Sequence, residues 1–317
     1  MLLTERGITN RIDIKSFYLR RILRIWPLYY LIVLLSFTLI PFLANTIPAF
    51  QQETHYFNKV LKLQESPYSI LVLFLLFLPN FALALKPAVV GAAQSWSVGV
   101  EEQFYLIWPH LINRIGNKLI LLIGFIMIGL LPQWADLIHF IHPAIGETLH
   151  FIIKIIPINV MAIGGIGAFF LYYHKESLQA FFKSATLFVI NTLLFLILCS
   201  VDIDFPAKNL LFDIVIMLEI LFVIQSHFKI NIRHKQLERI GEISYGVYMY
   251  HPLMMYCCFS LWNTVIPIQN NIGYNISIYV SVILSTLAIS RLSYSMFERK
   301  FIAIKNKKFT VVQSGKH

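Results

Sequence analysis

Apolar residues run in long, uninterrupted stretches along this chain, and short polar connections separate the stretches. A helix needs about 20 apolar residues to cross a bilayer, and most stretches approach that length. Lipid offers the backbone no hydrogen-bond partner, so only helices and closed barrels cross it, and continuous stretches favour helices. We therefore predict an all-α membrane helix bundle with about eight transmembrane helices. The predicted ranges are 25–43, 68–85, 118–132, 151–172, 184–200, 209–228, 245–262 and 273–297.

Basic residues gather in every second connection between these stretches. They precede the first stretch, follow the second and the eighth, and separate the fourth from the fifth and the sixth from the seventh. The positive-inside rule places such connections in the cytoplasm, so we predict that both termini are cytoplasmic. The alternation holds only if residues 87–117 do not cross, and we predict a re-entrant or interfacial half-helix near 95–115. One domain is expected over 1–302, followed by a basic cytoplasmic tail, 303–317.

Composition agrees with a membrane protein and argues against two other classes. Hydrophobic residues make up 57% of the chain and charged residues 13%, whereas soluble domains carry about 25% charged residues. The net charge of +10 would suit nucleic acid, but the positive charge lies in short connections where topology requires it, so we predict no nucleic-acid partner. Cys199, Cys257 and Cys258 lie in or beside apolar stretches without metal-ligand spacing, so no metal site is predicted.

Three arginines precede the first apolar stretch, in the segment Arg20 to Tyr30. Arg20 and Arg24 are four residues apart, and Arg21 and Arg24 are three apart, so a helix places them on one face. Guanidinium groups can bind a phosphorylated ligand through paired hydrogen bonds. The alternative is a positive-inside signal whose side chains extend to the membrane surface.

Two adjacent carboxylates, Glu101 and Glu102, lie among aromatic residues in the segment Trp96 to Pro109. On a helix, Glu101 shares a face with Phe104 and Tyr105. A carboxylate in a dry site can have a raised pKa and act in acid–base chemistry, so Glu101 is a candidate catalytic residue. The alternative is a pair of interfacial charges that balance the arginines, with aromatic anchors beside them.

A third polar segment, Ile243 to Pro252, opens the seventh stretch and contains three tyrosines and His251. Tyr248 and His251 share a helical face, and a histidine inside a span is a functional candidate. A histidine that serves only as a hydrogen-bonded core residue is the alternative.

Two acids, Asp213 and Glu219, lie in the sixth stretch, and Arg291 in the last is a possible partner for Glu219. An ion relay and a buried structural ion pair both remain open.

Together, the first three segments resemble the acyltransferase-3 family of integral membrane acyltransferases. The family carries Arg-Arg-x-x-Arg-x-x-Pro-x-Tyr, Trp-Ser-x-x-x-Glu-x-x-Phe-Tyr-x-x-x-Pro and Ile-Ser-Tyr-x-x-Tyr-x-x-His-x-Pro stretches. They match Arg20 to Tyr29, Trp96 to Pro109 and Ile243 to Pro252, in the family's order.

The resemblance implies an O-acyltransferase in a bacterial inner membrane. It would move an acyl group, commonly acetyl, from an acyl-coenzyme A donor such as acetyl-CoA, a substrate and not a permanently bound cofactor. The acceptor would be a hydroxyl of a surface polysaccharide, lipopolysaccharide or lipid-linked saccharide. The site residues would be Arg20, Arg21 and Arg24 for the donor, Glu101 for catalysis, and Trp96, Phe104, Tyr105, Tyr248 and His251 to shape the site.

One departure concerns the start of the chain. The family pattern has two further helices before the arginines, and the first carries a histidine that acts as the base. No residue here matches that histidine, so we expect a form that lacks the first two transmembrane helices, and an inactive family member is one alternative. A transporter or flippase of glycan intermediates is another, although we find no internal repeat of the kind that transporters show.

Overall fold

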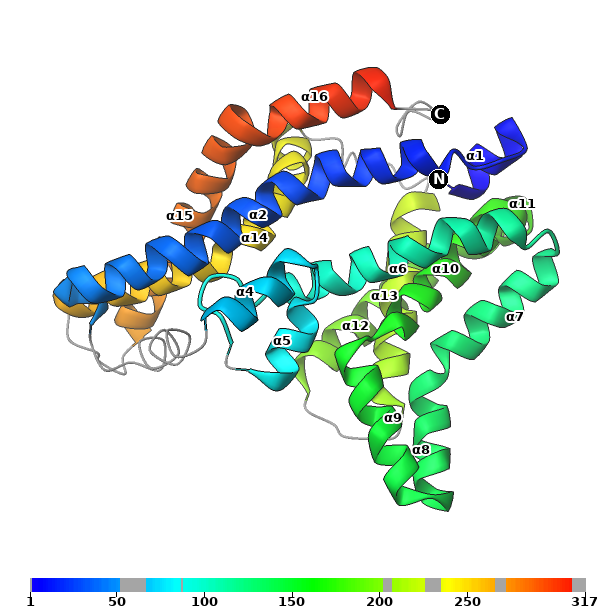
Figure 1. Cartoon of the computed structure of the whole chain (residues 1–317). Coiled ribbons are helices and arrows are strands. Elements are labelled where there is room, and N and C mark those ends of the chain that lie inside the picture. Colours follow the sequence, from blue (N-terminus) through cyan, green and yellow to red (C-terminus); the bar gives the residue numbers. More distant parts are fainter. Residues whose placement is uncertain are drawn as a thin grey trace. The chain divides into compact units, whose positions relative to one another are not determined.

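A computed structural model describes residues 2–51, 67–86, 88–201, 207–225, 235–265 and 272–309 (Figure 1). Every regular element in these ranges is helical, and no strand occurs in them. The prediction of an all-α protein is therefore confirmed.

The chain divides into two compact units. The first comprises Met1–Ile12 and Leu106–Ile232, and the second comprises Asp13–Tyr105 and Arg233–His317. The boundary falls inside helix α6 (Ser95–Arg114), whose first half belongs to the second unit. The expected single domain over 1–302 stays a prediction.

The second unit is built on the long helix α2 (Ile14–Thr46). Asp13 caps its start, where the carboxylate accepts hydrogen bonds from the Ser16 hydroxyl at 2.6 Å and from the Ser16 amide at 3.1 Å. These bonds hold the pKa of Asp13 below its usual value. Leu28, Tyr29 and Ile32 on α2 are fully buried and form the centre of the core.

Further helices pack around α2 in this unit. Helices α14 (Lys235–Val265) and α15 (Ile272–Ser293) pack against each other, and α14 also contacts α2. A π-helical turn, η2 (Tyr294–Glu298), joins α15 to α16 (Arg299–Lys308), which lies along α2 (Figure 1). Residues 303–308 of the predicted tail are therefore helical, and residues 310–317 lie outside the described residues. The short elements η1 (Pro48–Phe50), α4 (Pro67–Leu75) and α5 (Pro79–Leu85) complete the unit.

The first unit consists of shorter helices. Helix α7 packs on α10, α8 forms a hairpin with α9, and α12 packs on α13. The Arg6 guanidinium on α1 donates to the carbonyls of Ile112 and Ile115 and so holds α1 against the end of α6. The helices are α1 (Leu2–Thr9), α7 (Lys118–Gly129), α8 (Leu131–Ile141), α9 (Pro143–Ile155), α10 (Ile158–Tyr173), α11 (Lys175–Phe182), α12 (Ala185–Ser200) and α13 (Lys208–Gln225).

Fewer helices qualify as membrane spans than the apolar stretches suggested. Among the described residues, Ile14–Thr46 and Ile272–Lys308 are long and apolar enough by themselves. Three pairs qualify only together, and each is bent: α7 with α8 by 56°, α9 with α10 by 65°, and α11 with α12 by 76°. The described structure thus gives two spans, or up to five, and the eight predicted spans are not confirmed.

Local chemistry explains two of the broken stretches. The predicted span 68–85 divides into α4 and α5 at Phe77, whose φ of 57° ends the helix before Pro79 begins the next. The predicted span 151–172 breaks at Pro157, which precedes α10. Residues 226–228 of the predicted span 209–228 lie outside the described residues. Helix α6 is not among the candidate spans, and its re-entrant character stays a prediction.

Candidate functional site

A cavity of about 580 Å³ opens in the second unit between α2, α6 and α14. This volume lies within the range of about 300–1,000 Å³ that is common for small-molecule sites. Each of the three polar segments contributes to the wall, although more than 200 residues separate the first from the last in the chain. The lining residues are Arg21, Arg24, Ile25, Ser97, Val98, Glu101, Ser244, Tyr245 and Tyr248.

A close contact with the turn between α4 and α5 positions α6 beside this cavity. Gly99 lets the helix approach, because a Cβ atom there would lie 2.7 Å from Cδ of Pro79. One turn further on, the Gln103 amide donates to the Phe77 carbonyl at 3.0 Å and to Oδ1 of Asn80 at 2.9 Å. Phe77 itself stacks on Tyr29 of α2 at 4.3 Å between ring centroids. The α4–α5 turn therefore fixes the position of α6 and, with it, the position of Glu101 at the cavity.

Arg21 and Glu101 both lie against Tyr105. The Arg21 guanidinium carbon is 4.3 Å from the centroid of the Tyr105 ring, and the phenol hydroxyl donates to Oε2 of Glu101 at 3.4 Å. A cation above an aromatic face is attracted by the negative face of the ring. Tyr105 thus orients a cation and an anion without joining them, and within the described part of the chain neither Arg21 nor Arg24 forms an ion pair with Glu101.

Burial dominates the electrostatics of the two neighbouring carboxylates. Burial raises the pKa of Glu101, and the positive charges of Arg21 and Arg24 lower it only in part. Burial also raises the pKa of Glu102, but this side chain accepts a hydrogen bond from the Trp26 indole at 3.3 Å and is not among the cavity-lining residues. Glu101 is the carboxylate that the cavity wall presents.

Hydroxyl groups of Ser97, Tyr245 and Tyr248 also line the cavity. The Tyr248 hydroxyl donates to the Gln94 carbonyl at 2.8 Å and is also hydrogen-bonded to the Ser97 hydroxyl. The Gln94 amide in turn donates to the Met249 carbonyl at 2.6 Å, which ties the start of α6 to α14. The Tyr245 hydroxyl donates to the Ile25 carbonyl at 3.1 Å and ties α14 to α2.

The His251 side chain forms a hydrogen bond with the backbone of its own helix, α14. Pro252 lies inside this helix and has no N–H group, so the carbonyl four residues earlier, at Tyr248, loses its helical partner. Nδ1 of His251 lies 2.7 Å from that carbonyl oxygen, where an N–H on Nδ1 replaces the missing donor. His251 therefore stabilises the turn that presents Tyr248.

Five predicted site residues are not among those that line the cavity: Arg20, Trp96, Phe104, Tyr105 and His251. Arg20 is buried and donates to the Phe309 carbonyl at 2.9 Å, which holds the end of α16. Trp96 is 40% exposed on α6, and Phe104 lies edge-to-face with Tyr105. Arg20 therefore links α2 to the end of α16.

The remaining polar candidates lie elsewhere. Glu219, in the first unit, accepts hydrogen bonds from the Asn191 amide at 2.7 Å and the Thr192 hydroxyl at 3.0 Å. Arg291, in the second unit, lines a different cavity. The cysteines are free thiols, and no cluster of three or more potential metal ligands occurs among the described residues.

Sequence reasoning missed Gly99, Gln103 and Phe77, which fix α6 against the α4–α5 turn. The sequence contained an indication for Gly99, because a glycine inside a helical segment often marks a close approach between backbones. The φ of 57° at Phe77 has no counterpart in the sequence.

The fold and the site together describe a helical protein with apolar helices of membrane-spanning length and a cavity that presents two arginines and one carboxylate. The family model described as an acyltransferase domain matches residues 1–292, so the chain belongs to the acyltransferase-3 family and is an acyltransferase. This confirms the resemblance carried by the three segments.

Two relatives were found, and no solved structure matches significantly. The chain is 27% identical to "Putative acetyltransferase ORF330" of Acidianus two-tailed virus over 260 residues, which cover 80% of this chain and 69% of the viral protein. It is 33% identical to an uncharacterized protein of Haemophilus influenzae (strain Rd) over 107 residues, or 32% of this chain and 38% of that protein.

Proposed function

We propose that this acyltransferase moves an acyl group, most simply acetyl, from an acyl-coenzyme A donor to a hydroxyl of a cell-surface glycan or lipid-linked saccharide in a bacterial inner membrane. The observation that carries the proposal is that Arg21, Arg24 and Glu101 line one cavity. Acetyl is favoured because the viral relative is named an acetyltransferase.

Arg21 and Arg24 would bind the phosphates of the donor. Coenzyme A presents several phosphate oxygens, and guanidinium groups bind such oxygens through paired, charge-assisted hydrogen bonds. Arg24 is exposed at the cavity and Arg21 is half-buried over Tyr105, so the two could engage successive phosphates along the donor. The positive-inside pattern predicts that this end of α2 faces the cytoplasm, where acyl-coenzyme A is found.

Glu101 would act on the attacking hydroxyl. The acceptor oxygen forms a bond to the thioester carbonyl carbon, the carbon–sulfur bond breaks, and the coenzyme A thiolate leaves. The hydroxyl proton passes to the Glu101 carboxylate and then to the thiolate, so the carboxylate is regenerated. A carboxylate whose pKa is raised by burial is a stronger base than one in water, which suits this task.

The test uses the purified full chain in lipid nanodiscs with acetyl-coenzyme A and a glycan acceptor, and follows release of the free thiol. Arg24→Ala should raise KM for the donor by about 10- to 100-fold, the equivalent of one lost charge-assisted hydrogen-bond pair of about 1.5–3 kcal/mol. Glu101→Ala should lower kcat by about 100-fold or more, as expected for loss of a proton acceptor.

Lys300→Ala is the matched control, since it removes an exposed positive charge on α16 that does not line the cavity. Its donor KM should equal that of the wild type. Unchanged turnover in both Arg24→Ala and Glu101→Ala, at normal protein levels, would refute the site assignment.

A further inference from the structure

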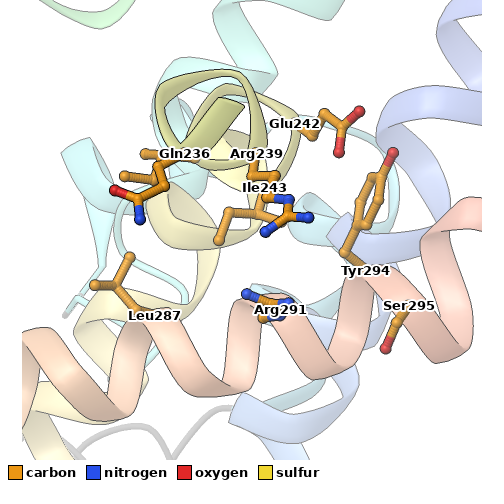
Figure 2. Close-up of a pocket in the computed structure, with 9 residues that line it drawn as sticks. Gln236, Arg239, Glu242, Ile243, Leu287, Arg291, Tyr294 and Ser295 are labelled. Carbon is orange, nitrogen blue, oxygen red and sulfur yellow. The ribbon is translucent and has the colours of Figure 1, made fainter. Parts of the chain in front are cut away.

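A second cavity, of about 510 Å³, lies in the second unit between the first turns of α14 and the junction of α15 with η2 (Figure 2). It shares no residue with the cavity of Arg21 and Arg24, although Ile243 on its wall directly precedes Ser244 on the other. The lining residues are Gln236, Arg239, Ile240, Glu242, Ile243, Leu287, Arg291, Tyr294 and Ser295.

Two arginines contribute most of the charge in this second cavity. Figure 2 shows Arg239 on α14 and Arg291 on α15, with the cavity between the two helices. Within the described ranges, neither guanidinium forms an ion pair, and the nearby Glu242 lies toward Tyr294. Two like charges that share a cavity repel each other, so an anion with several oxygens between them would be stabilised by both.

An apolar stripe leads away from the second cavity along α15. Val280, Leu284 and Leu287 follow one another at helical spacing and continue to Arg291 on the same face. Val280 is 47% exposed and Leu284 is 61% exposed, and the described helices do not cover them. On the α14 side of the cavity, Ile240 is 49% exposed. A polar cavity at the end of an exposed apolar stripe fits a molecule with an anionic head and an apolar tail.

We propose that the second cavity binds the phosphate headgroup of an anionic phospholipid, with one acyl chain along the stripe of α15. The shared chemistry with a nucleotide is the phosphate group, and the exposed apolar stripe that continues from the cavity favours a ligand with an acyl chain. The positions also suit a lipid, because Arg239 precedes the predicted span 245–262 and Arg291 lies in the last turn of α15, toward the basic end of the predicted span 273–297. This inference does not depend on the acyl-transfer chemistry proposed for Glu101.

The experiment measures lipid binding by native mass spectrometry of the full chain released from detergent. Dioleoylphosphatidylglycerol is titrated against the wild type and against the double variant Arg239→Gln/Arg291→Gln. We expect the dissociation constant of the tightest bound lipid to rise at least about tenfold in the variant, as expected for the loss of two charge-assisted contacts. The double variant Lys300→Gln/Lys307→Gln removes the same charge from the surface of α16 and should bind like the wild type.

Two further measurements separate the sources of phosphate and guard against a misfolded variant. Coenzyme A at millimolar concentration should not displace the lipid, and displacement would overturn the lipid assignment in favour of a nucleotide. Glu242→Gln, which removes a repulsive carboxylate beside the arginines, should tighten lipid binding. Equal lipid affinity in the wild type, the arginine variant and Glu242→Gln would overturn the proposal.

Discussion

Glu101 and Glu102 are neighbours in sequence, yet the fold gives them different surroundings. Glu101 lines the cavity and accepts a hydrogen bond from Tyr105, whereas Glu102 accepts one from Trp26 and leaves Oε1 buried without a partner. Helical geometry alone separates the two side chains by about 100° around α6. The different directions in which the two side chains leave α6 therefore explain why Glu101 lines the cavity and Glu102 packs against Trp26.

The buried carboxylate of Glu101 predicts a pH-dependent cost to stability. Because burial raises its pKa, the ionised form is disfavoured in the folded state, and stability is lost as the pH rises from the usual pKa through the raised one. Glu101→Gln removes this ionisation. Its melting temperature should exceed that of the wild type by more at about pH 8 than at about pH 5, as measured by thermal unfolding in detergent.

Glu176→Gln, at an exposed carboxylate on α11, is the control and should show no such change with pH. A difference between Glu101→Gln and the wild type that is the same at both pH values would contradict the expectation.

Several site residues were predictable from sequence because of their type and spacing. Arg21, Arg24, Glu101 and Tyr248 carry groups that are costly near lipid, and each lines the cavity. The part played by Gln94 was not predictable, because its amide meets the Met249 carbonyl across 155 positions of sequence. Such a contact exists only after α6 and α14 have packed.

At the level of helices, α14 contains a proline and also a side chain that replaces the hydrogen bond lost at that proline. Pro252 removes the donor for the Tyr248 carbonyl, and His251 supplies another. His251→Ala should therefore destabilise the protein by about 1 kcal/mol, the usual net contribution of a hydrogen bond. In a Pro252→Ala background the backbone N–H returns, so the same substitution should cost much less.

A double-mutant cycle of unfolding free energies measures this coupling between His251 and Pro252. Pro41→Ala in α2 is the control background, because it restores an N–H in a different helix from His251 and should leave the cost of His251→Ala unchanged. An equal cost in all three backgrounds would show that the histidine acts through another contact.

The position of α6 depends on Gly99, which predicts an unusual response to alanine. Glycine to alanine inside a helix normally stabilises by about 0.5–1 kcal/mol. Here a Cβ atom would lie 2.7 Å from Pro79 and 3.1 Å from the Phe77 carbonyl oxygen, so overpacking should outweigh the gain and cost about 1–3 kcal/mol. Donor turnover should fall as well, because Glu101 is half a turn away.

Gly124→Ala in α7 is the matched control, since its added Cβ would meet no atom of another described element within 4 Å. That variant should be as stable as the wild type or more so in the same thermal unfolding assay. If Gly99→Ala were stabilised to the same extent, the close approach of α6 to Pro79 would not constrain the fold.

The helical class was predictable from hydropathy, but the bends were not. Apolar stretches measure only whether a segment tolerates lipid, and they do not record where its helix changes direction. Pro157 gave a local signal for one break, whereas the 76° bend between α11 and α12 follows Lys183 and has no proline. The eight spans predicted from apolar stretches therefore exceed the two described helices that are long and apolar enough to cross a membrane by themselves.

At the scale of the whole molecule, the cavity-lining residues of the three motif-bearing segments belong to one unit, even though residues 110–242 separate the second segment from the third. The order of motifs along the chain was visible in the sequence, and their convergence on one cavity was not, since it requires α2, α6 and α14 to pack in three dimensions.

Membrane orientation is the property of the whole chain that charge alone predicts. The connection around His142 has no lysine or arginine between residues 133 and 150, whereas the segment that ends at Lys308 is rich in them. In a variant without Cys199, Cys257 and Cys258, a single cysteine at His142→Cys should react with a membrane-impermeant maleimide in intact cells. A cysteine at Lys308→Cys should react only after the inner membrane is opened. If both cysteines were labelled in intact cells, or if neither were labelled until the inner membrane was opened, the two positions would lie on the same side of the membrane. Either result would contradict the predicted orientation and, with it, the predicted cytoplasmic location of Arg21 and Arg24.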